Sequence, residues 1–143
     1  MTAATPQIGA RVNPTDVLGI QQLLARYCLT HDRGDMDAYA RLWAPDAELH
    51  LHRSVWTGPD EITEHIAQAD PGLHMAGIPD ITADDGDDGD NADRANGMQA
   101  FLFVERDGHA LRIGRYDDTY VRLDGEWRFA SRRISFIRTP KAE

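Results

Sequence analysis

Two residues far apart in the chain, Asp32 and His74, have side chains that together could move a proton. Asp32 lies in the segment HDRGD and His74 in GLHMAG. A carboxylate that accepts a hydrogen bond from one imidazole nitrogen fixes the tautomer of the ring, leaves the other nitrogen as a base and stabilises the imidazolium. Tyr27 precedes Asp32 by five residues, and its hydroxyl could donate to an oxygen that becomes negative. These residues predict general acid–base chemistry.

Each member of the pair also has an ordinary structural role open to it. Asp32 could lie exposed in a turn and pair with Arg33, and His74 could be a core histidine bonded to the backbone. No serine or cysteine stands in a nucleophile elbow, and the chain has no glycine-rich phosphate loop. The sequence therefore does not suggest acyl transfer, and the catalytic hypothesis depends on Asp32 and His74 lying together.

Three further histidines raise the question of a metal site. His50 and His52 are two residues apart on a predicted strand, so they would point to the same face, with His65 as a third ligand. That face lies opposite Leu49 and Leu51 and should meet solvent or another subunit. We therefore expect no metal, and the chemistry of the pair requires no cofactor.

Composition and charge limit the class of protein. The 143 residues suit one domain, and a formal net charge of −9 argues against a nucleic-acid partner, because no basic stripe could replace phosphate counterions. Cys28 is the single cysteine, so no intrachain disulfide is possible. The first residues are not typical of a signal peptide, so we expect none, and no apolar run approaches the ~20 residues of a membrane span. We expect a cytoplasmic protein.

Helical periodicity covers most of the first half of the chain. Asn13 and Pro14 begin a helix that Gly34 ends. A second helix follows, and its apolar positions run through Trp43 until Pro45 stops it. A third helix runs from Pro59 through Ile66. Between the last two, residues 47–51 alternate between apolar and polar, which predicts a strand.

The second half of the chain is typical of an antiparallel sheet. Strands are predicted over residues 73–83, 98–105, 110–123 and 127–137. Asp-Gly turns separate the last three of these strands, as in hairpins. Helices segregated from an antiparallel sheet define an α+β domain. A strongly curved sheet folded over three N-terminal helices would leave a cavity on its concave side.

An acidic segment interrupts this pattern. Residues 84–95 are rich in aspartate and glycine without apolar periodicity, which predicts a mobile loop. A cation site over 84–93 stays open, although the acidic positions do not fit the helix-loop-helix calcium pattern. We expect a flexible N-terminus over 1–12, a single domain over 13–139 and a tail over 140–143.

Several short motifs resemble one known family when they are taken together. They are Arg26-Tyr27, HDRGD, LWAPDA, Tyr116-Asp117-Asp118 and DGEWRF, and their order resembles the SnoaL-like branch of the nuclear transport factor 2-like superfamily over residues 14–138. The strand LHMAGIPDIT is similar to the scytalone dehydratase and bile-acid 7α-dehydratase branch. The resemblance implies a cone-shaped α+β barrel.

The resemblance also implies roles for individual residues. Asp32 and His74 match the catalytic aspartate and histidine of the family, and Arg132 matches a pocket arginine, unless a register slip by one residue turns Arg133 inward. Tyr27 matches a family tyrosine. The apolar wall of the pocket is expected to comprise Leu49, Leu51, Met75, Phe101 and Phe103. The chain lacks the second pocket histidine that scytalone dehydratase carries on the strand over 98–105.

The leading hypothesis is a cofactor-independent lyase. It would be a dehydratase that acts on a cyclic or steroid-like hydroxy-carbonyl compound, with His74 as the base and Asp32 as the residue that orients it. An isomerase or cyclase of natural-product or steroid metabolism would use the same proton abstraction. A non-catalytic ligand-binding or assembly module is the third hypothesis. The resemblance further implies a small hydrophobic ligand and a homodimer or homotrimer that forms through the sheet.

Overall fold

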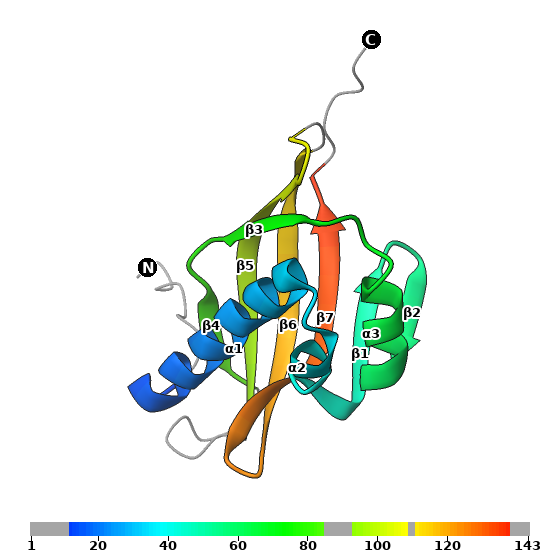
Figure 1. The fold of residues 1–143 in the computed structure, drawn as a ribbon. Helices are drawn as coiled ribbons and strands as arrows, with labels where there is room; N and C mark the ends of the chain where they lie inside the picture. Colours follow the sequence, from blue (N-terminus) through cyan, green and yellow to red (C-terminus); the bar gives the residue numbers. More distant parts are fainter. Residues whose placement is uncertain (1–11, 85–92, 109–110, 138–143) are drawn as a thin grey trace, which may run out of the picture.

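The protein is described by a computed structural model over residues 12–84, 93–108 and 111–137 (Figure 1). The elements in chain order are α1 (Pro14–Arg33), α2 (Met36–Ala40), β1 (Trp43–Leu51), β2 (Ser54–Thr57), α3 (Pro59–Ile66), β3 (Gly72–Ala76), β4 (Asp80–Ala83), β5 (Arg94–Glu105), β6 (Leu111–Leu123) and β7 (Glu126–Phe136). Most of the predicted acidic loop and the two predicted loose ends lie outside the described residues. Within those ranges, no helix has the length and apolar character needed to cross a membrane.

The seven strands form one curved sheet that does not close into a barrel. Their order is β2-β1-β7-β6-β5-β3, and β4 also pairs with β5. The pairing of β1 with β7 is parallel, whereas the other pairs are antiparallel. Figure 1 shows α1 and α2 crossing one face of this sheet, with α3 beside β1. The predicted α+β class and the mostly antiparallel sheet are confirmed.

Helix α1 begins and ends where the sequence predicts. The side chain of Asn13 accepts a hydrogen bond of 2.9 Å from the backbone N–H of Asp16, and Pro14 takes the first helical position. Gly34 ends the helix in the left-handed conformation, with φ of 69°. The inward face buries Ile20 and Tyr27. This face fixes which side chains near the end of α1 turn toward the sheet.

The second predicted helix is too long. α2 ends at Ala40, and Trp43 begins β1 instead of closing a helix. Trp43 pairs with Phe129 of β7, and the Phe129 N–H donates to the carbonyl of Leu42 at 2.8 Å. The helical spacing of the apolar residues was therefore overridden by a strand partner from the far end of the domain.

The strand predicted over residues 73–83 is wrong as a single element. It consists of β3 and β4, which are separated by Gly77, Ile78 and Pro79. Pro79 has no N–H to donate to a ladder, so it interrupts the strand. Both pieces pair with β5, which starts at Arg94, earlier than the predicted start at 98.

The hairpin between β6 and β7 follows the predicted Asp-Gly turn. Asp124 and Gly125 have φ values of 52° and 79°, and two positive φ angles are typical of the tight turn that matches the twist of paired strands. The other turn contains Gly108, also with positive φ. This hairpin sets the register of β7 and hence the face to which Arg132 points.

Candidate active site

The structure brings Asp32 and His74 into direct contact. Asp32 lies in the last turn of α1, and His74 is the third residue of the edge strand β3. Oδ1 of Asp32 lies 2.6 Å from Nδ1 of His74, and Oδ2 accepts the backbone N–H of His74 at 2.8 Å. The carboxylate thus holds both the ring and the main chain of the histidine. This contact fixes the Nδ1–H tautomer and leaves Nε2 for another partner.

Both side chains of the pair are largely shielded from solvent. The exposed fractions are 10% for Asp32 and 6% for His74. Burial lowers the pKa of His74 below its ordinary value of 6.5, and the hydrogen bond and charge of Asp32 oppose this shift. His74 is therefore neutral at neutral pH, which is the form required of a base.

His31 is a second imidazole beside the pair. Its ring centroid lies 4.6 Å from that of His74, and the two planes meet at 78°. Burial, and next the neighbouring His74, lower the pKa of His31 to about 4. His31 was not predicted from the sequence to belong to the site. Its spacing of four residues from Tyr27 was the available signal.

Tyr27 lies next to the two imidazoles and is almost completely buried. Its ring centroid is 5.9 Å from His74 and 5.4 Å from Tyr39. Burial raises the pKa of Tyr27, and the positive charge of Arg132 opposes that effect. The hydroxyl therefore stays protonated near neutral pH and is available as a donor.

Arg132, and not Arg133, is the inward residue of the pair on β7. Arg132 is 1% exposed, whereas Arg133 is exposed. Nε and Nη2 of Arg132 donate to the two carboxylate oxygens of Asp118, each at 2.8 Å. The guanidinium also stacks over aromatic rings, 3.7 Å from the ring centre of Tyr116 and 4.2 Å from that of Tyr27. Arg132 supports two residues of the cavity wall but does not itself line the cavity.

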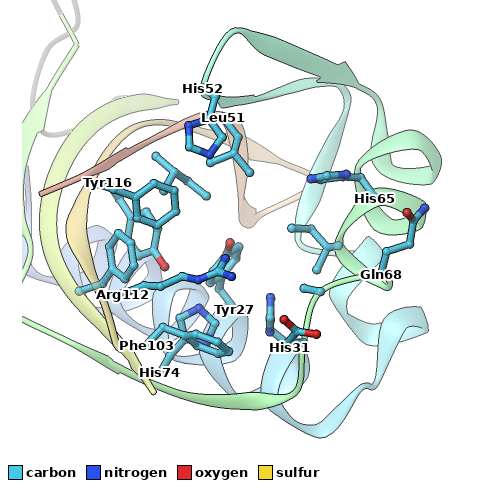
Figure 2. A pocket seen from close by; sticks show the side chains of 16 residues that line it. Tyr27, His31, Leu51, His52, His65, Gln68, His74, Phe103, Arg112 and Tyr116 are labelled. Carbon is cyan, nitrogen blue, oxygen red and sulfur yellow. The ribbon is translucent and has the colours of Figure 1, made fainter. Parts of the chain in front are cut away.

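These residues surround a cavity of about 460 Å³ between α1, α3 and the sheet (Figure 2). Figure 2 shows Tyr27, His31, His74 and Phe103 on one side and His65 and Gln68 on the other. The lining residues are Tyr27, His31, Leu51, His52, His65, Ile66, Gln68, Ala69, Asp70, His74, Phe101, Phe103, Arg112, Tyr116, Ile134 and Phe136. The wall is mainly apolar and aromatic, with polar groups around it, as in sites for small organic molecules.

The predicted apolar wall needs two corrections. Leu51, Phe101 and Phe103 line the cavity, but Leu49 and Met75 do not. Leu49 is fully buried in the core, while Met75 is 63% exposed. Successive strand residues point to opposite faces, so Met75 must point outward when its neighbour His74 points inward.

Other lining residues were not assigned to the wall from sequence. Ile134 and Phe136 follow Arg132 at steps of two on β7, and strand alternation could have identified them once Arg132 was known to face inward. His52 and His65, considered as metal ligands, line the cavity instead. The ring of His65 stacks on Trp56 with centroids 3.7 Å apart.

One group of side chains has the composition of a metal site. Among the described residues, ligand atoms of His31, Asp32 and His74 lie within 4.8 Å of one another. Two imidazoles and a carboxylate suit several transition metals. The 2.6 Å contact between Asp32 and His74 nevertheless has the length of a strong hydrogen bond. The geometry therefore favours a shared proton between these two residues.

Comparisons with known proteins agree with this architecture. The SnoaL-like domain family matches residues 14–133. The solved structure of Rv3472, a protein of unknown function from Mycobacterium tuberculosis, is similar to this chain, with 27% identity, a TM-score of 0.78 and coverage of 89% of this chain and 79% of that one. No curated protein matches the chain significantly.

Two other similar structures have functional names. A candidate scytalone dehydratase from Novosphingobium aromaticivorans shares 20% identity, with a TM-score of 0.73 and coverage of 90% of this chain and 89% of that one. A hexachlorocyclohexane dehydrochlorinase, LinA type 2, shares 21% identity, with a TM-score of 0.73 and coverage of 90% of each chain. At these identities, the similarity shows the fold.

Proposed function

Because the chain belongs to the SnoaL-like family, we propose that it is a small-molecule lyase that removes water from a cyclic hydroxy-carbonyl compound. The observation that carries the proposal is the Asp32–His74 contact at the wall of a mainly apolar cavity. The names of two similar structures, a dehydratase and a dehydrochlorinase, both denote eliminations. An elimination of this kind needs one base and one group that stabilises the carbonyl oxygen.

His74 is the base in this mechanism. Its Nδ1 is bonded to Asp32, so Nε2 takes the proton from the carbon next to the substrate carbonyl. The electrons of the C–H bond move into an enolate and then form a C=C bond as the C–O bond to the hydroxyl breaks. The imidazolium returns its proton to the leaving hydroxyl, and water departs. Asp32 keeps the ring oriented and stabilises its positive charge.

Tyr27 supports this step from the cavity wall, and Arg132 supports Tyr27. The protonated hydroxyl of Tyr27 can donate to the carbonyl or the leaving oxygen. Arg132 acts through Tyr27 and Tyr116, on whose rings it stacks, because it does not line the cavity and two of its donors are bound to Asp118. No step requires a cofactor.

A cyclic, largely apolar substrate fits the wall of the cavity. Phe101 and Tyr116 stack with centroids 4.2 Å apart, and Phe103 lies 4.7 Å from the ring of His74. Flat rings pack well against such surfaces. A volume of about 460 Å³ is within the usual range for small-molecule sites.

The test is turnover of a panel of cyclic β-hydroxy ketones, followed by the ultraviolet absorbance of the conjugated enone. We expect His74→Ala to lower the rate by about 10²–10⁴-fold, which is typical for loss of a general base. His50→Ala is the matched control, since it makes the same substitution at a histidine of β1 that does not line the cavity. Unchanged turnover in His74→Ala would refute the mechanism. Shifted double bonds without loss of water would identify an isomerase, and binding without turnover would identify a ligand-binding module.

We also propose that the protein forms a homodimer or homotrimer through the outer face of its sheet. Leu73, Met75 and Leu111 are exposed there, and Leu73 and Leu111 both pair with Val104 of β5. Apolar side chains in neighbouring strands form a surface that favours association. Light scattering after size-exclusion chromatography tests the assembly, and a monomer at all concentrations would contradict it.

A further inference from the structure

His31 is a second imidazole in the wall of the cavity. It lines the cavity next to His74, and its ring also lies 6.0 Å from Phe103 and 6.1 Å from Tyr39. Its side chain is 12% exposed. Two imidazoles thus share one wall, and the mechanism based on Asp32 and His74 uses only one of them.

The two imidazoles are not equivalent, because Asp32 bonds to only one of them. Nδ1 of His31 lies 3.7 Å from Oδ1 of Asp32, which exceeds a hydrogen bond, whereas His74 is held at 2.6 Å. Burial and the neighbouring His74 lower the pKa of His31 to about 4. His31 is therefore neutral during turnover at neutral pH, with one nitrogen that donates and one that accepts.

The distance between the two rings suits the atoms of a hydroxy-carbonyl compound. The carbonyl oxygen lies two bonds from the carbon that loses its proton, roughly 2.4 Å away. A substrate whose carbon lies against Nε2 of His74 can therefore bring its carbonyl oxygen close to His31, whose ring is centred 4.6 Å from that of His74. A neutral imidazole can stabilise such an oxygen by donating its proton in a hydrogen bond.

The cationic side chains near the cavity are less well placed for this task. Arg132 is bound to Asp118 through two hydrogen bonds and does not line the cavity. Arg112 lines the cavity from β6, but its side chain is 52% exposed and points an Nη2 toward Glu105 at 3.4 Å. Neither arginine lies against His74, as His31 does.

We propose that His31 is a second catalytic residue, which donates a hydrogen bond to the substrate oxygen on which negative charge develops while His74 holds the abstracted proton. This inference rests on the proposed lyase function. In the step, His74 gains the proton from carbon, the electron pair moves to the carbonyl oxygen, and the N–H of His31 stabilises that oxygen. The proton of His31 is not transferred.

The experiment uses 4-nitrophenol as a mimic of the enolate. Nitrobenzene is the matched ligand, because it lacks only the phenolic oxygen. At a pH where the ligand is ionised, bound 4-nitrophenolate carries the negative oxygen of the enolate, and its absorbance reports the ionisation. We expect His31→Phe to weaken 4-nitrophenol binding about tenfold, the size of one hydrogen bond, and to leave nitrobenzene binding unchanged. His31→Gln, which keeps an N–H donor, should retain most of the affinity.

The control is His50→Phe, the same substitution on β1 at a histidine that does not line this cavity; it should bind both ligands as the unaltered protein does. Equal binding of the two ligands by the unaltered protein, or an unchanged preference in His31→Phe, overturns the inference. A separate measurement tests the proposed function, which is refuted if His74→Ala forms the enone at an unchanged rate. A preference for 4-nitrophenol over nitrobenzene that is lost in His31→Phe supports the inference, whichever ketone proves to be the substrate.

Discussion

The buried ion pair of Arg132 and Asp118 allows a prediction whose size follows from the structure. Both side chains are almost inaccessible, with exposed fractions of 1% and 0%. Asp118 accepts two hydrogen bonds from Arg132 and a third from the hydroxyl of Tyr120, all of 2.8 Å. Burial alone would lower the pKa of Arg132, but the Asp118 carboxylate overcomes this and raises it. The guanidinium therefore stays charged.

Arg132→Met removes the positive charge and leaves the carboxylate of Asp118 buried with the tyrosine as its remaining donor. Breaking a buried pair in this way costs about 3–5 kcal/mol of unfolding free energy. At roughly 2–4 °C per kcal/mol for a domain near this size, the melting temperature should fall by about 6–20 °C. Chemical denaturation and calorimetry measure the two quantities.

A double-mutant cycle separates the ion pair from simple packing. Asp118→Asn combined with Arg132→Met removes both charges, so the double variant should be less destabilised than the sum of the single variants, with a coupling of about 1–3 kcal/mol. Arg133→Met is the matched control on the exposed face of β7 and should change stability by less than about 0.5 kcal/mol. Additive losses, or a loss below about 1 kcal/mol in Arg132→Met, would refute the reasoning.

Three further substitutions give separate tests. Asp32→Asn removes the negative charge and weakens the hydrogen bond that together raise the pKa of His74, so the acid limb of the pH profile of kcat/KM should move to lower pH; a shift to higher pH would contradict the assignment. Gly97→Ala would place a methyl 2.5 Å from the hydroxyl of Tyr120 and should destabilise the protein by about 1–3 kcal/mol in urea denaturation. Phe103→Leu should weaken nitrobenzene binding about fourfold or more, at ~0.8 kcal/mol per methylene removed, while Met75→Leu should not; unchanged binding in Phe103→Leu would show that Phe103 does not contact the ligand.

The sequence identified the elements that local chemistry defines. The cap at Asn13, the stop at Gly34 and the turn at Asp124 depend on neighbouring residues alone, and the structure has all three. Trp43 was assigned to a helix because its spacing is helical, and only its pairing with Phe129 of β7 places it in a strand. Local periodicity contains no information about a parallel partner so distant in the chain.

The candidate site, too, could be predicted only where the residues themselves are informative. The types of Asp32 and His74 suggested their chemistry, and the structure places the two side chains in contact. Met75 was assigned to the wall because it is apolar and adjoins His74, yet adjacent strand residues cannot share a face. The position of His31 relative to His74 depends on how β3 crosses the end of α1, and periodicity within either segment does not predict that crossing.

The parallel contact of β1 with β7 has a consequence for how the chain acquires its cavity during synthesis. β7 leaves the ribosome after every other described element, and it supplies both the partner of β1 and the wall residues Ile134 and Phe136. Until β7 docks, the aromatic wall on β5 and β6 lacks its neighbour, so the nascent chain should depend on chaperones longer than a helical bundle would. In refolding, binding of 4-nitrophenol should therefore appear only in the final phase of the tryptophan fluorescence change, and earlier binding would contradict this order.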